Sequence, residues 1–230
     1  MRLRLAWLLC TCITMLIVAA SPSLAELYVG GELGLSLPNS FSNVSGLGTD
    51  SGLKGSDLDL ATSPLYGAKV GYFFPRINWL GIEGEFFYTN PHMKQQVSQS
   101  TGTVNVPGIG PVPCCAPQNV VGAHVRMMTG AINVIARYPG KRFQPYVGVG
   151  FTMNWARFSS PDQRFGRSQT ASDTSPGFNV LAGSRFFLTK HVALYGEYKY
   201  TKSSFDFGNN VLFQADYSAH NLIAGVSLHF

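Results

Sequence analysis

The sequence predicts an all-β fold, an eight-stranded antiparallel up-and-down transmembrane β-barrel. First, the stretch Tyr217 to Phe230 alternates apolar residues with polar or small ones, which is the periodicity of a strand. Second, its apolar face runs to a terminal Phe, as suits a strand whose outer side meets lipid. Third, seven similar segments precede it, joined by links that alternate between long and short.

The composition agrees with this fold. The chain has 230 residues, 25 glycines, 13% aromatic and 13% charged residues. Many strands with a tight interior and interfacial aromatic residues need such a composition, and a soluble helical domain does not. The mean hydropathy of +0.08 is mild because each lipid-facing residue alternates with an interior one. No stretch after residue 25 is long and apolar enough for a membrane helix.

Residues 1–25 are predicted to be a secretory signal peptide. Arg2 and Arg4 precede the apolar stretch 5–20, and the small residues before position 26 favour cleavage after Ala25. A membrane anchor is the alternative, but a strand begins directly after Ala25. Cleavage removes two arginines and lowers the formal charge from +5 to +3, a mildly basic balance that argues against nucleic acid as a partner. The barrel domain is then 26–230.

Each barrel segment shows the alternation of a strand over at least the length of a membrane-spanning strand. Interior and lipid-facing residues are expected to take turns along all of them. The eight segments are Glu26–Leu37, Ser63–Phe74, Trp79–Asn90, Val120–Tyr138, Phe143–Phe158, Thr174–Leu188, Val192–Phe205 and Tyr217–Phe230.

The links between these segments predict the orientation. The short links are 75–78, 139–142 and 189–191, and the long ones, rich in Ser, Gly, Asn and Pro, are 38–62, 91–119, 159–173 and 206–216. Short turns on one side and long loops on the other are typical of outer-membrane barrels with periplasmic turns and extracellular loops. A periplasmic or secreted β-sandwich is the alternative, but such a fold does not need lipid-facing alternation that ends in Phe.

Two adjacent cysteines, Cys114 and Cys115, remain after signal cleavage. They lie in VPGIGPVPCCAPQ, a run rich in Pro and Gly that predicts a loop. In an oxidising compartment they can form a vicinal disulfide or pair between chains. A locally rigid loop without redox chemistry is the favoured alternative.

Five stretches show a resemblance to a known family: LYGAKVGYFF, WLGIEGEFFYT, FQPYVGVGFTMNW, VALYGEYKY and NLIAGVSLHF. They resemble the small eight-stranded outer-membrane barrels of the OmpA transmembrane-domain and OmpX type. The resemblance implies an outer-membrane location among lipid and lipopolysaccharide, and it implies that Phe230 is the signal read by the barrel-assembly machinery. Because the sequence ends at the last strand, the peptidoglycan-binding domain of full-length OmpA proteins is not expected.

The polar side of each strand places eight charged residues inside the barrel. Their charges sum to zero, and the interior of such a barrel has room only for side chains. A salt-bridged plug is therefore expected, whereas a ring of one sign would indicate an ion filter. The eight are Glu32, Lys69, Glu83, Glu85, Arg137, Arg185, Glu197 and Lys199.

Counting along the strands predicts two layers in this network. Glu32 and Lys69 are the expected direct pair in a mid-depth layer, on neighbouring strands. Arg137 and Arg185 are expected nearer the periplasm, with Glu83. On the fourth segment, the phase of the polar residues changes near Gly130, which predicts a β-bulge there.

Catalysis has weak support in the sequence. Some eight-stranded barrels of this membrane modify lipid A, and Asp216, Ser218 and His220 lie on one face of the last strand, so they match a triad in composition. No lipase motif surrounds them. The other histidines, 92, 124, 191 and 229, lack metal-ligand spacing, and no catalytic site, cofactor or metal is predicted.

The function predicted from these observations is structural. We expect a barrel with a closed lumen that supports envelope integrity, adhesion or binding of an unknown extracellular ligand through loops 38–62 and 91–119. The alternatives are a narrow channel for small solutes and a lipid A-modifying enzyme.

Overall fold

The computed structural model describes residues 26–46, 53–54, 57–94, 96–98, 101–106, 110–114, 118–120, 123–160, 169–206 and 213–230. The predicted signal peptide, residues 1–25, lies outside the described residues. In the described part of the chain, no helix has the length and hydrophobicity needed to cross a membrane.

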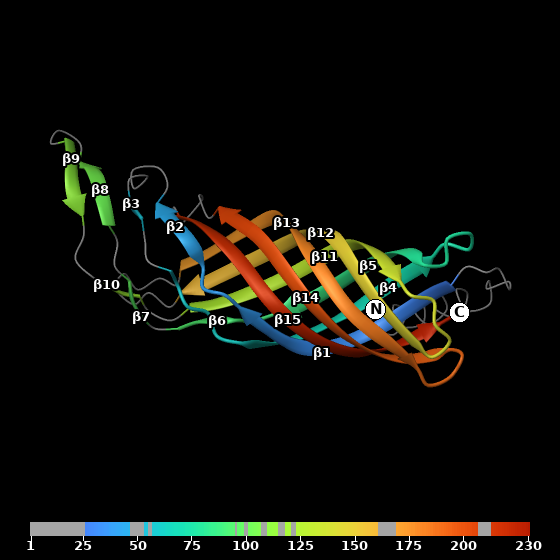
Figure 1. The fold of residues 1–230 in the computed structure, drawn as a ribbon. Coiled ribbons are helices and arrows are strands. Elements are labelled where there is room, and N and C mark those ends of the chain that lie inside the picture. Colours follow the sequence, from blue (N-terminus) through green and yellow to red (C-terminus); the bar gives the residue numbers. More distant parts are fainter. Residues whose placement is uncertain are drawn as a thin grey trace, which may run out of the picture.

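Eight antiparallel strands close into a barrel, as the sequence predicts (Figure 1). Seven successive pairings join them in chain order, and the last strand pairs with the first from Tyr28↔His229 to Pro38↔Ala219, which leaves no open edge between them. The barrel strands are β1 Glu26–Pro38, β4 Ser63–Phe73, β5 Leu80–Thr89, β11 Ala123–Arg137, β12 Phe143–Ser160, β13 Gln169–Phe187, β14 Val192–Asp206 and β15 Phe213–His229.

The boundaries at the short turns agree with the prediction within two residues. At the long-loop end β11 begins at Ala123, three residues after its predicted start at Val120, which belongs to the short strand β10 Gln118–Val120. Three other strands run further than predicted: β12 extends to Ser160, β13 begins at Gln169 and β15 begins at Phe213. The pairs continue with them, to Ser160↔Gln169 between β12 and β13 and to Asp206↔Gln214 between β14 and β15. Polar residues that the composition predicted to be loop therefore belong to hydrogen-bonded strands.

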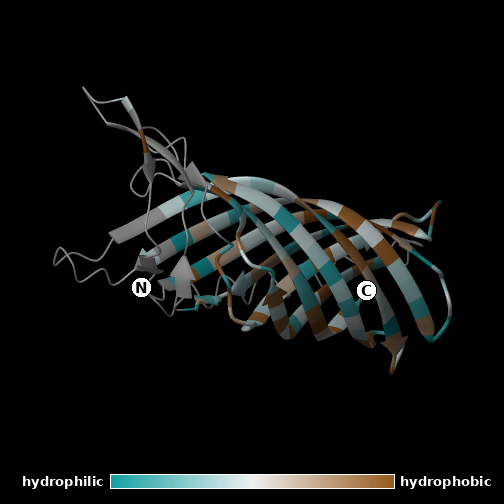
Figure 2. Ribbon diagram, turned by 60° about the vertical axis from the view of Figure 1, so that its left-hand side comes forward, coloured by the Kyte–Doolittle hydropathy of each residue, from teal (hydrophilic) through white to brown (hydrophobic). Residues whose placement is uncertain are grey.

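Side chains alternate between the interior and the outside along every barrel strand. On β12 the outward Val147, Val149 and Phe151 are each more than half exposed, whereas the inward Thr152 and Asn154 are fully buried. Figure 2 shows the same alternation as bands of hydrophobic and hydrophilic colour along the strands. Apolar outside and polar inside is the arrangement of a barrel in lipid.

No bulge interrupts β11, so the predicted break near Gly130 is wrong. The strand pairs without a shift with β5 from Met127↔Thr89 to Ala136↔Leu80, and with β12 along its length. Arg126 lies outward while Asn133 lies inward. The apparent phase change arose because a polar residue stands on the outer face near the strand's end, not because the register shifts.

Glycines make room for large inward aromatic rings. Tyr28 lies opposite Gly71, Tyr146 opposite Gly183, and Tyr195 opposite Gly225 in the strand register. A Cβ on Gly183 would stand 2.7 Å from the Tyr146 ring, closer than van der Waals contact allows. Each ring therefore lies over the bare backbone of the next strand, which explains part of the high glycine content.

At the long-loop end the sheet continues beyond the barrel. β15 also pairs with β2 Ser42–Gly46, then β3 Leu53–Lys54, β8 Thr101–Val106 and β9 Gly110–Cys114 follow in order. The short strands β6 His92–Met93, β7 Gln96–Ser98 and β10 Gln118–Val120 lie at the same end. The predicted long loops 38–62 and 91–119 thus contain strands among their described residues.

The Pro-rich run before the cysteines is part of a hairpin and not simply loop. β9 pairs with β8 from Gly102↔Cys114 to Val106↔Gly110, with Pro111 and Pro113 inside the strand. β9 is the last strand of its sheet, and Pro is tolerated on such an edge because its missing N–H is not needed. Cys115 and the side chain of Cys114 lie outside what the structure describes, so the predicted disulfide stays a prediction.

An apolar cluster fills the barrel where the long loops begin. Phe41 from the first loop and Met93 from the second pack with Phe205 and Tyr217 of the wall, all of them buried. The further members are Leu60, Val125, Met127, Ala156, Ala215 and Ala219. Phe41 is held by backbone hydrogen bonds to Leu58 in both directions. The first two long loops therefore contribute side chains to a hydrophobic closure of the barrel mouth.

Candidate functional site: the charged interior of the barrel

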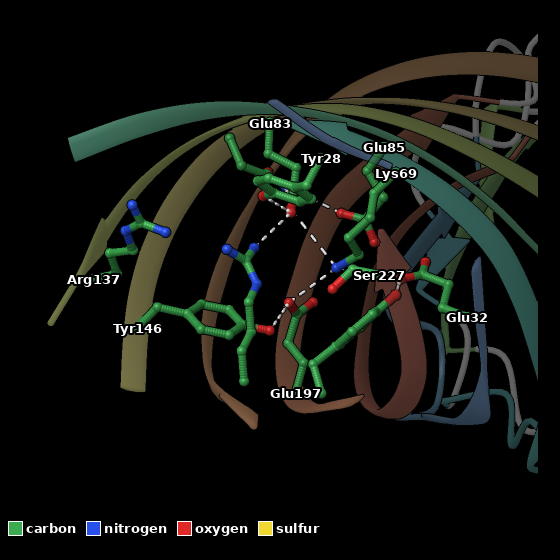
Figure 3. Close-up of polar contacts among 12 residues, drawn as sticks. Tyr28, Glu32, Lys69, Glu83, Glu85, Arg137, Tyr146, Glu197 and Ser227 are labelled. Atoms are coloured by element: carbon green, nitrogen blue, oxygen red, sulfur yellow. Dashed lines mark hydrogen bonds and ion pairs between the residues drawn. The ribbon is translucent and has the colours of Figure 1, made fainter. Parts of the chain in front are cut away.

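The structure places all eight predicted charged residues inside the barrel, with exposed fractions of 0–8%. They come from six strands, β1, β4, β5, β11, β13 and β14. Figure 3 shows most of them pointing toward one another across the lumen. Buried charges are costly unless they are paired and hydrogen-bonded, so their partners decide what this region can do.

Lys69 of β4 contacts three carboxylates at once. Its Nζ lies 3.0 Å from Glu197, 3.2 Å from Glu32 and 3.7 Å from Glu83. These residues belong to β14, β1 and β5, so the ammonium links four strands of the wall. The side chains of the four residues are at most 1% exposed. Lys69 therefore does more than pair with the Glu32 of its neighbouring strand.

Lys199 forms the second cationic centre at mid-depth. Its ammonium contacts Glu85 and lies 3.0 Å from Glu197. Asn133 donates hydrogen bonds to Glu85 at 3.0 Å and to Glu83 at 3.2 Å. β5 and β14 are not neighbours in the sheet, so the pair Glu85–Lys199 joins two separate parts of the wall.

Arg185 lies among aromatic rings. Its guanidinium is 4.1 Å from the ring centre of Tyr28 and 4.7 Å from that of Tyr146, and one nitrogen is 3.5 Å from Glu83. Tyr28 in turn donates a hydrogen bond of 2.5 Å to Glu83. Such rings stabilise a desolvated cation through their electron-rich faces.

Three tyrosines complete the network, and the sequence prediction missed them. Besides Tyr28, Tyr146 donates to Glu197 at 2.8 Å and Tyr195 to Glu32 at 3.2 Å. Each tyrosine has the same inward parity as the charged residues of the network. Extending that rule from charged residues to all polar ones would have found them.

Arg137 forms a separate layer near the short turns. It lies 2.6 Å from Glu26, donates to Gln144 at 3.1 Å and stands 3.6 Å from the ring centre of Phe73. The sequence grouped Arg137 with Glu83, but its carboxylate partner is Glu26. Glu26 shares the inward phase of β1 and was not among the eight predicted residues.

The short-turn end of the lumen is open to a hollow of about 620 Å³. Its lining includes Glu26, Gln144 and His229 from the wall and Lys141 and Lys190 from the turns. His229 Nδ1 lies 2.6 Å from Glu26, whose side chain is 24% exposed. Solvent therefore reaches the Arg137 layer, whereas the Lys69 and Lys199 ammonium groups above it are buried.

The triad-like residues of β15 have other partners. The imidazole of His220 lies 2.6 Å from the Tyr198 hydroxyl, and Asp216 accepts a 2.6 Å hydrogen bond from Ser204. Ser218 accepts one of 2.8 Å from the side chain of Asn39. Each of the three side chains is thus engaged in a bond outside the set.

The remaining histidines occupy different surroundings. His92 and His124 stack edge to face with ring centres 4.2 Å apart on the outer side of the barrel, whereas His229 is buried between Glu26 and Ser227. His191 contacts the backbone oxygen of His229. Among the described residues, no three His, Cys, Asp or Glu side chains form a group that could hold a metal ion.

Phe230 lies at the end of β15 and faces outward. Its backbone N–H donates to the Leu27 oxygen at 2.9 Å, and its side chain is 37% exposed. The ring is therefore accessible at the short-turn end, which is compatible with a recognition signal and leaves that role a prediction.

Comparison with solved structures identifies the fold independently. The chain is similar to Neisserial surface protein A, with 18% identity and a TM-score of 0.52 over 89% of this chain and 97% of that one. It is also similar to the outer membrane protein OprG from Pseudomonas aeruginosa, with 14% identity and a TM-score of 0.51 over 90% and 96%. No curated protein sequence matches.

A family model extends over almost the whole sequence. The model described as "Outer membrane protein beta-barrel domain" matches residues 8–230, a range that includes every strand of the closed barrel. The chain therefore belongs to the outer membrane protein beta-barrel domain family, and it is an integral protein of the outer membrane.

Proposed function

We propose that this protein is a structural and surface-interaction protein whose barrel carries no open pore. On this proposal, the barrel anchors a rigid platform in the outer membrane, and the strands of the long-loop end bind an extracellular partner. The barrel-assembly machinery inserts the chain, and no catalytic step is assigned to it.

The observation that carries the proposal is the double closure of the lumen. Inside the barrel, Lys69, Lys199 and Arg185 are held by four glutamates, and the side chains of the three cations are at most 2% exposed. Toward the long-loop end, the apolar cluster around Phe41 and Phe205 fills the barrel. Ions would have to break buried ion pairs and then pass a hydrophobic closure, and either step opposes conduction.

The long-loop end supports the interaction role. β2, β3, β8 and β9 extend the barrel sheet past the mouth (Figure 1), so the described residues of the first two long loops include paired strands. Extended strands at a sheet edge can pair with a partner's strand, and loops on a rigid scaffold are common binding elements. The Pro111 and Pro113 edge of β9 limits such pairing on one side.

Planar-bilayer recording of the refolded protein tests the closed lumen. The wild type is expected to show no steady conductance steps. The control variant is Phe41→Ala with Phe205→Ala, which removes two large side chains of the apolar closure. It is expected to show brief openings, which would demonstrate that the measurement can detect conduction. A large steady conductance of the wild type would refute the proposal and favour the narrow channel.

Complementation of a deletion strain tests the platform role. One strain receives the wild-type gene, and a second receives a gene in which residues 96–120 are replaced by a short Gly-Ser linker. Both are expected to restore resistance to detergents, because the eight barrel strands are intact. Only the wild type is expected to restore attachment or ligand binding. Equal attachment by both strains would show that these residues do not bind the partner.

The enzyme alternative has a direct test of its own. His220 and Ser218 are the residues that a lipid-modifying site on β15 would need, and they bond instead to Tyr198 and Asn39. Mass spectrometry of lipid A from the wild-type and deletion strains should give the same species. A modification that disappears in the deletion strain and in Ser218→Ala would overturn the assignment as a non-enzyme.

A further inference from the structure

Two arginines face each other on the outer surface of the barrel. Arg126 of β11 lies directly opposite Arg157 of β12 in the strand register, and both side chains are exposed. Like charges directly opposite one another destabilise a pair of strands. Among the described residues, no ion pair joins either arginine to a carboxylate. Within the part of the chain that the structure describes, the pair therefore lacks the counter-charge that the interior cations have.

A hollow of about 360 Å³ lies beside Arg126 and Arg157. It is lined by His124, Arg126, Arg157 and Ser159, which are two register pairs of adjacent strands. His92 stacks against His124 on the other side. Every polar group in the lining can donate a hydrogen bond, and two of them are permanent cations.

The arginines stand at the border of the lipid-facing belt. One register step toward the membrane, Met128 and Trp155 face outward and are 46% and 43% exposed. Below them Ile132 and Phe151 continue the apolar surface, at 69% and 57% exposure. Trp is enriched where the hydrocarbon region meets the head groups. The arginines are thus the first charged side chains above the apolar belt on these two strands.

The strands beside the hollow bring no opposite charge to it. On β13 the residues facing outward beside Arg157 and Trp155 are Ser172 and Thr174, and on β5 Tyr88 lies opposite Met128. Asp173, between the two β13 residues, has the inward phase and accepts the backbone N–H of Asp206. Among the described residues, none therefore brings an anion to the hollow.

We propose that Arg126 and Arg157, with His124 and Ser159, bind a phosphate group of lipid A, the membrane anchor of lipopolysaccharide. Guanidinium groups bind phosphate through two parallel hydrogen bonds and are the preferred side chains for this recognition. On the orientation predicted from the link lengths, the long-loop end faces the extracellular side, where the outer leaflet consists of lipopolysaccharide, so a lipid phosphate would stand at this height. One phosphate between the two arginines removes their mutual repulsion.

The proposal predicts a reversal of stability between two lipids. In zwitterionic phosphatidylcholine vesicles, Arg126→Gln with Arg157→Gln should be at least as stable as the wild type, because two like charges are gone. In vesicles that contain lipopolysaccharide, the wild type should be the more stable of the two. The thermal midpoint of the folded band on semi-native gels measures both. A purely structural role of the arginines would give the same order in both lipids.

Direct binding tests the chemistry of the ligand. The refolded protein in detergent is titrated with bis-phosphorylated lipid A and with its dephosphorylated form, and binding is followed by native mass spectrometry. The double variant should bind phosphorylated lipid A about tenfold more weakly, and Lys202→Gln, which removes an exposed cation of β14 near the same end, should bind like the wild type. Equal affinity of the wild type for both forms would overturn the proposal.

Competitors separate the sources of the anion. Inorganic pyrophosphate at millimolar concentration should displace little lipid A, because the acyl chains lie along Met128 and Trp155 and add affinity. Full displacement by pyrophosphate, or tighter binding of a sulfated oligosaccharide than of lipid A, would mean that the hollow binds a soluble anion, and the lipid assignment would be wrong. Arg126→Lys with Arg157→Lys keeps the charge, and an unchanged affinity there would exclude the bidentate geometry.

Discussion

Lys69 and Glu32 form an ion pair of 3.2 Å although they are not opposite each other in the register. Glu32 lies opposite Gly67, and Lys69 lies opposite Gly30. The two side chains meet diagonally across β1 and β4, over backbone that carries no side chain of its own. Glu197, from the far side of the lumen, comes slightly closer to the same ammonium, at 3.0 Å.

Because Lys69 contacts three carboxylates, substitutions of Lys69 and of Glu32 should differ in their cost to stability. Lys69→Met removes the cation that Glu32 contacts and leaves the four buried glutamates with only Lys199 and Arg185, so it should lower the free energy of unfolding by roughly 3–5 kcal/mol. Glu32→Gln leaves Lys69 with Glu197 and Glu83 and should cost clearly less, about 1–2 kcal/mol. The double variant should recover only part of the Lys69→Met loss. Urea unfolding in lipid vesicles measures all three, and equal single losses would contradict the network.

The sequence could predict this network only in part. Parity along the strands assigns a side chain to the inside or the outside, and it placed Glu83, Arg185 and Lys199 where the structure has them. It could not show that Lys69 reaches Glu197, because the barrel's tilt and shear decide which strands meet across the lumen. Arg137 was misgrouped for the same reason, since its partner Glu26 lies on a strand remote in sequence.

The fold itself was more predictable than the ends of its strands. Alternation between lipid and lumen constrains every residue inside the membrane, so the number of barrel strands and their short turns followed from the pattern. Beyond the membrane that constraint disappears. The run around Pro111 and Pro113 contains strong turn signals, yet β9 forms there because an edge strand does not need every N–H. Phe41 gave no periodic signal of its place in the mouth.

A glycine pair tests the aromatic packing. Gly183→Ala should lower the free energy of unfolding by about 1–3 kcal/mol, because the new methyl group would stand 2.7 Å from Tyr146 and 2.5 Å from the Gly196 oxygen. Gly196→Ala is the matched control on the neighbouring strand, since no atom lies within 4 Å of its Cβ position. Equal stability of the two variants would show that the ring moves aside freely.

An arginine on the lipid-facing side of the barrel at mid-membrane should lower the stability of the refolded protein. Val149 lies outward in the middle of the apolar run of β12 and is 58% exposed, so Val149→Arg should cost roughly 2–4 kcal/mol of refolding stability in lipid. Gln214→Arg, outward on β15 at the long-loop end, should cost less than about 1 kcal/mol. A similar loss at both positions would mean that the membrane does not lie where the apolar belt indicates.

The orientation of the barrel can be measured with the native cysteines at one end and one introduced cysteine at the other. Cys114 ends β9 at the long-loop end, so a membrane-impermeant maleimide should label intact cells after mild reduction. Lys190→Cys in the Cys114→Ser, Cys115→Ser background places a thiol in a short turn, and it should react only after the cells are lysed. Labelling that needs no reductant would show that the two native thiols are free. The opposite pattern of access would invert the topology.

The terminal Phe should matter for assembly more than for stability. Phe230 contributes one backbone hydrogen bond, to Leu27 at 2.9 Å, and its ring faces outward at 37% exposure. Phe230→Ser keeps that bond and removes the ring. The amount of heat-modifiable, folded protein in cells should therefore fall severalfold, while the purified variant refolds in vesicles with a stability within about 1 kcal/mol of the wild type.

Leu228→Ser, outward on the same strand, is the matched control and should be closer to the wild type in cells. If Phe230→Ser lost stability in vesicles to the same degree as it lost assembly in cells, the ring would act through packing and not as a signal.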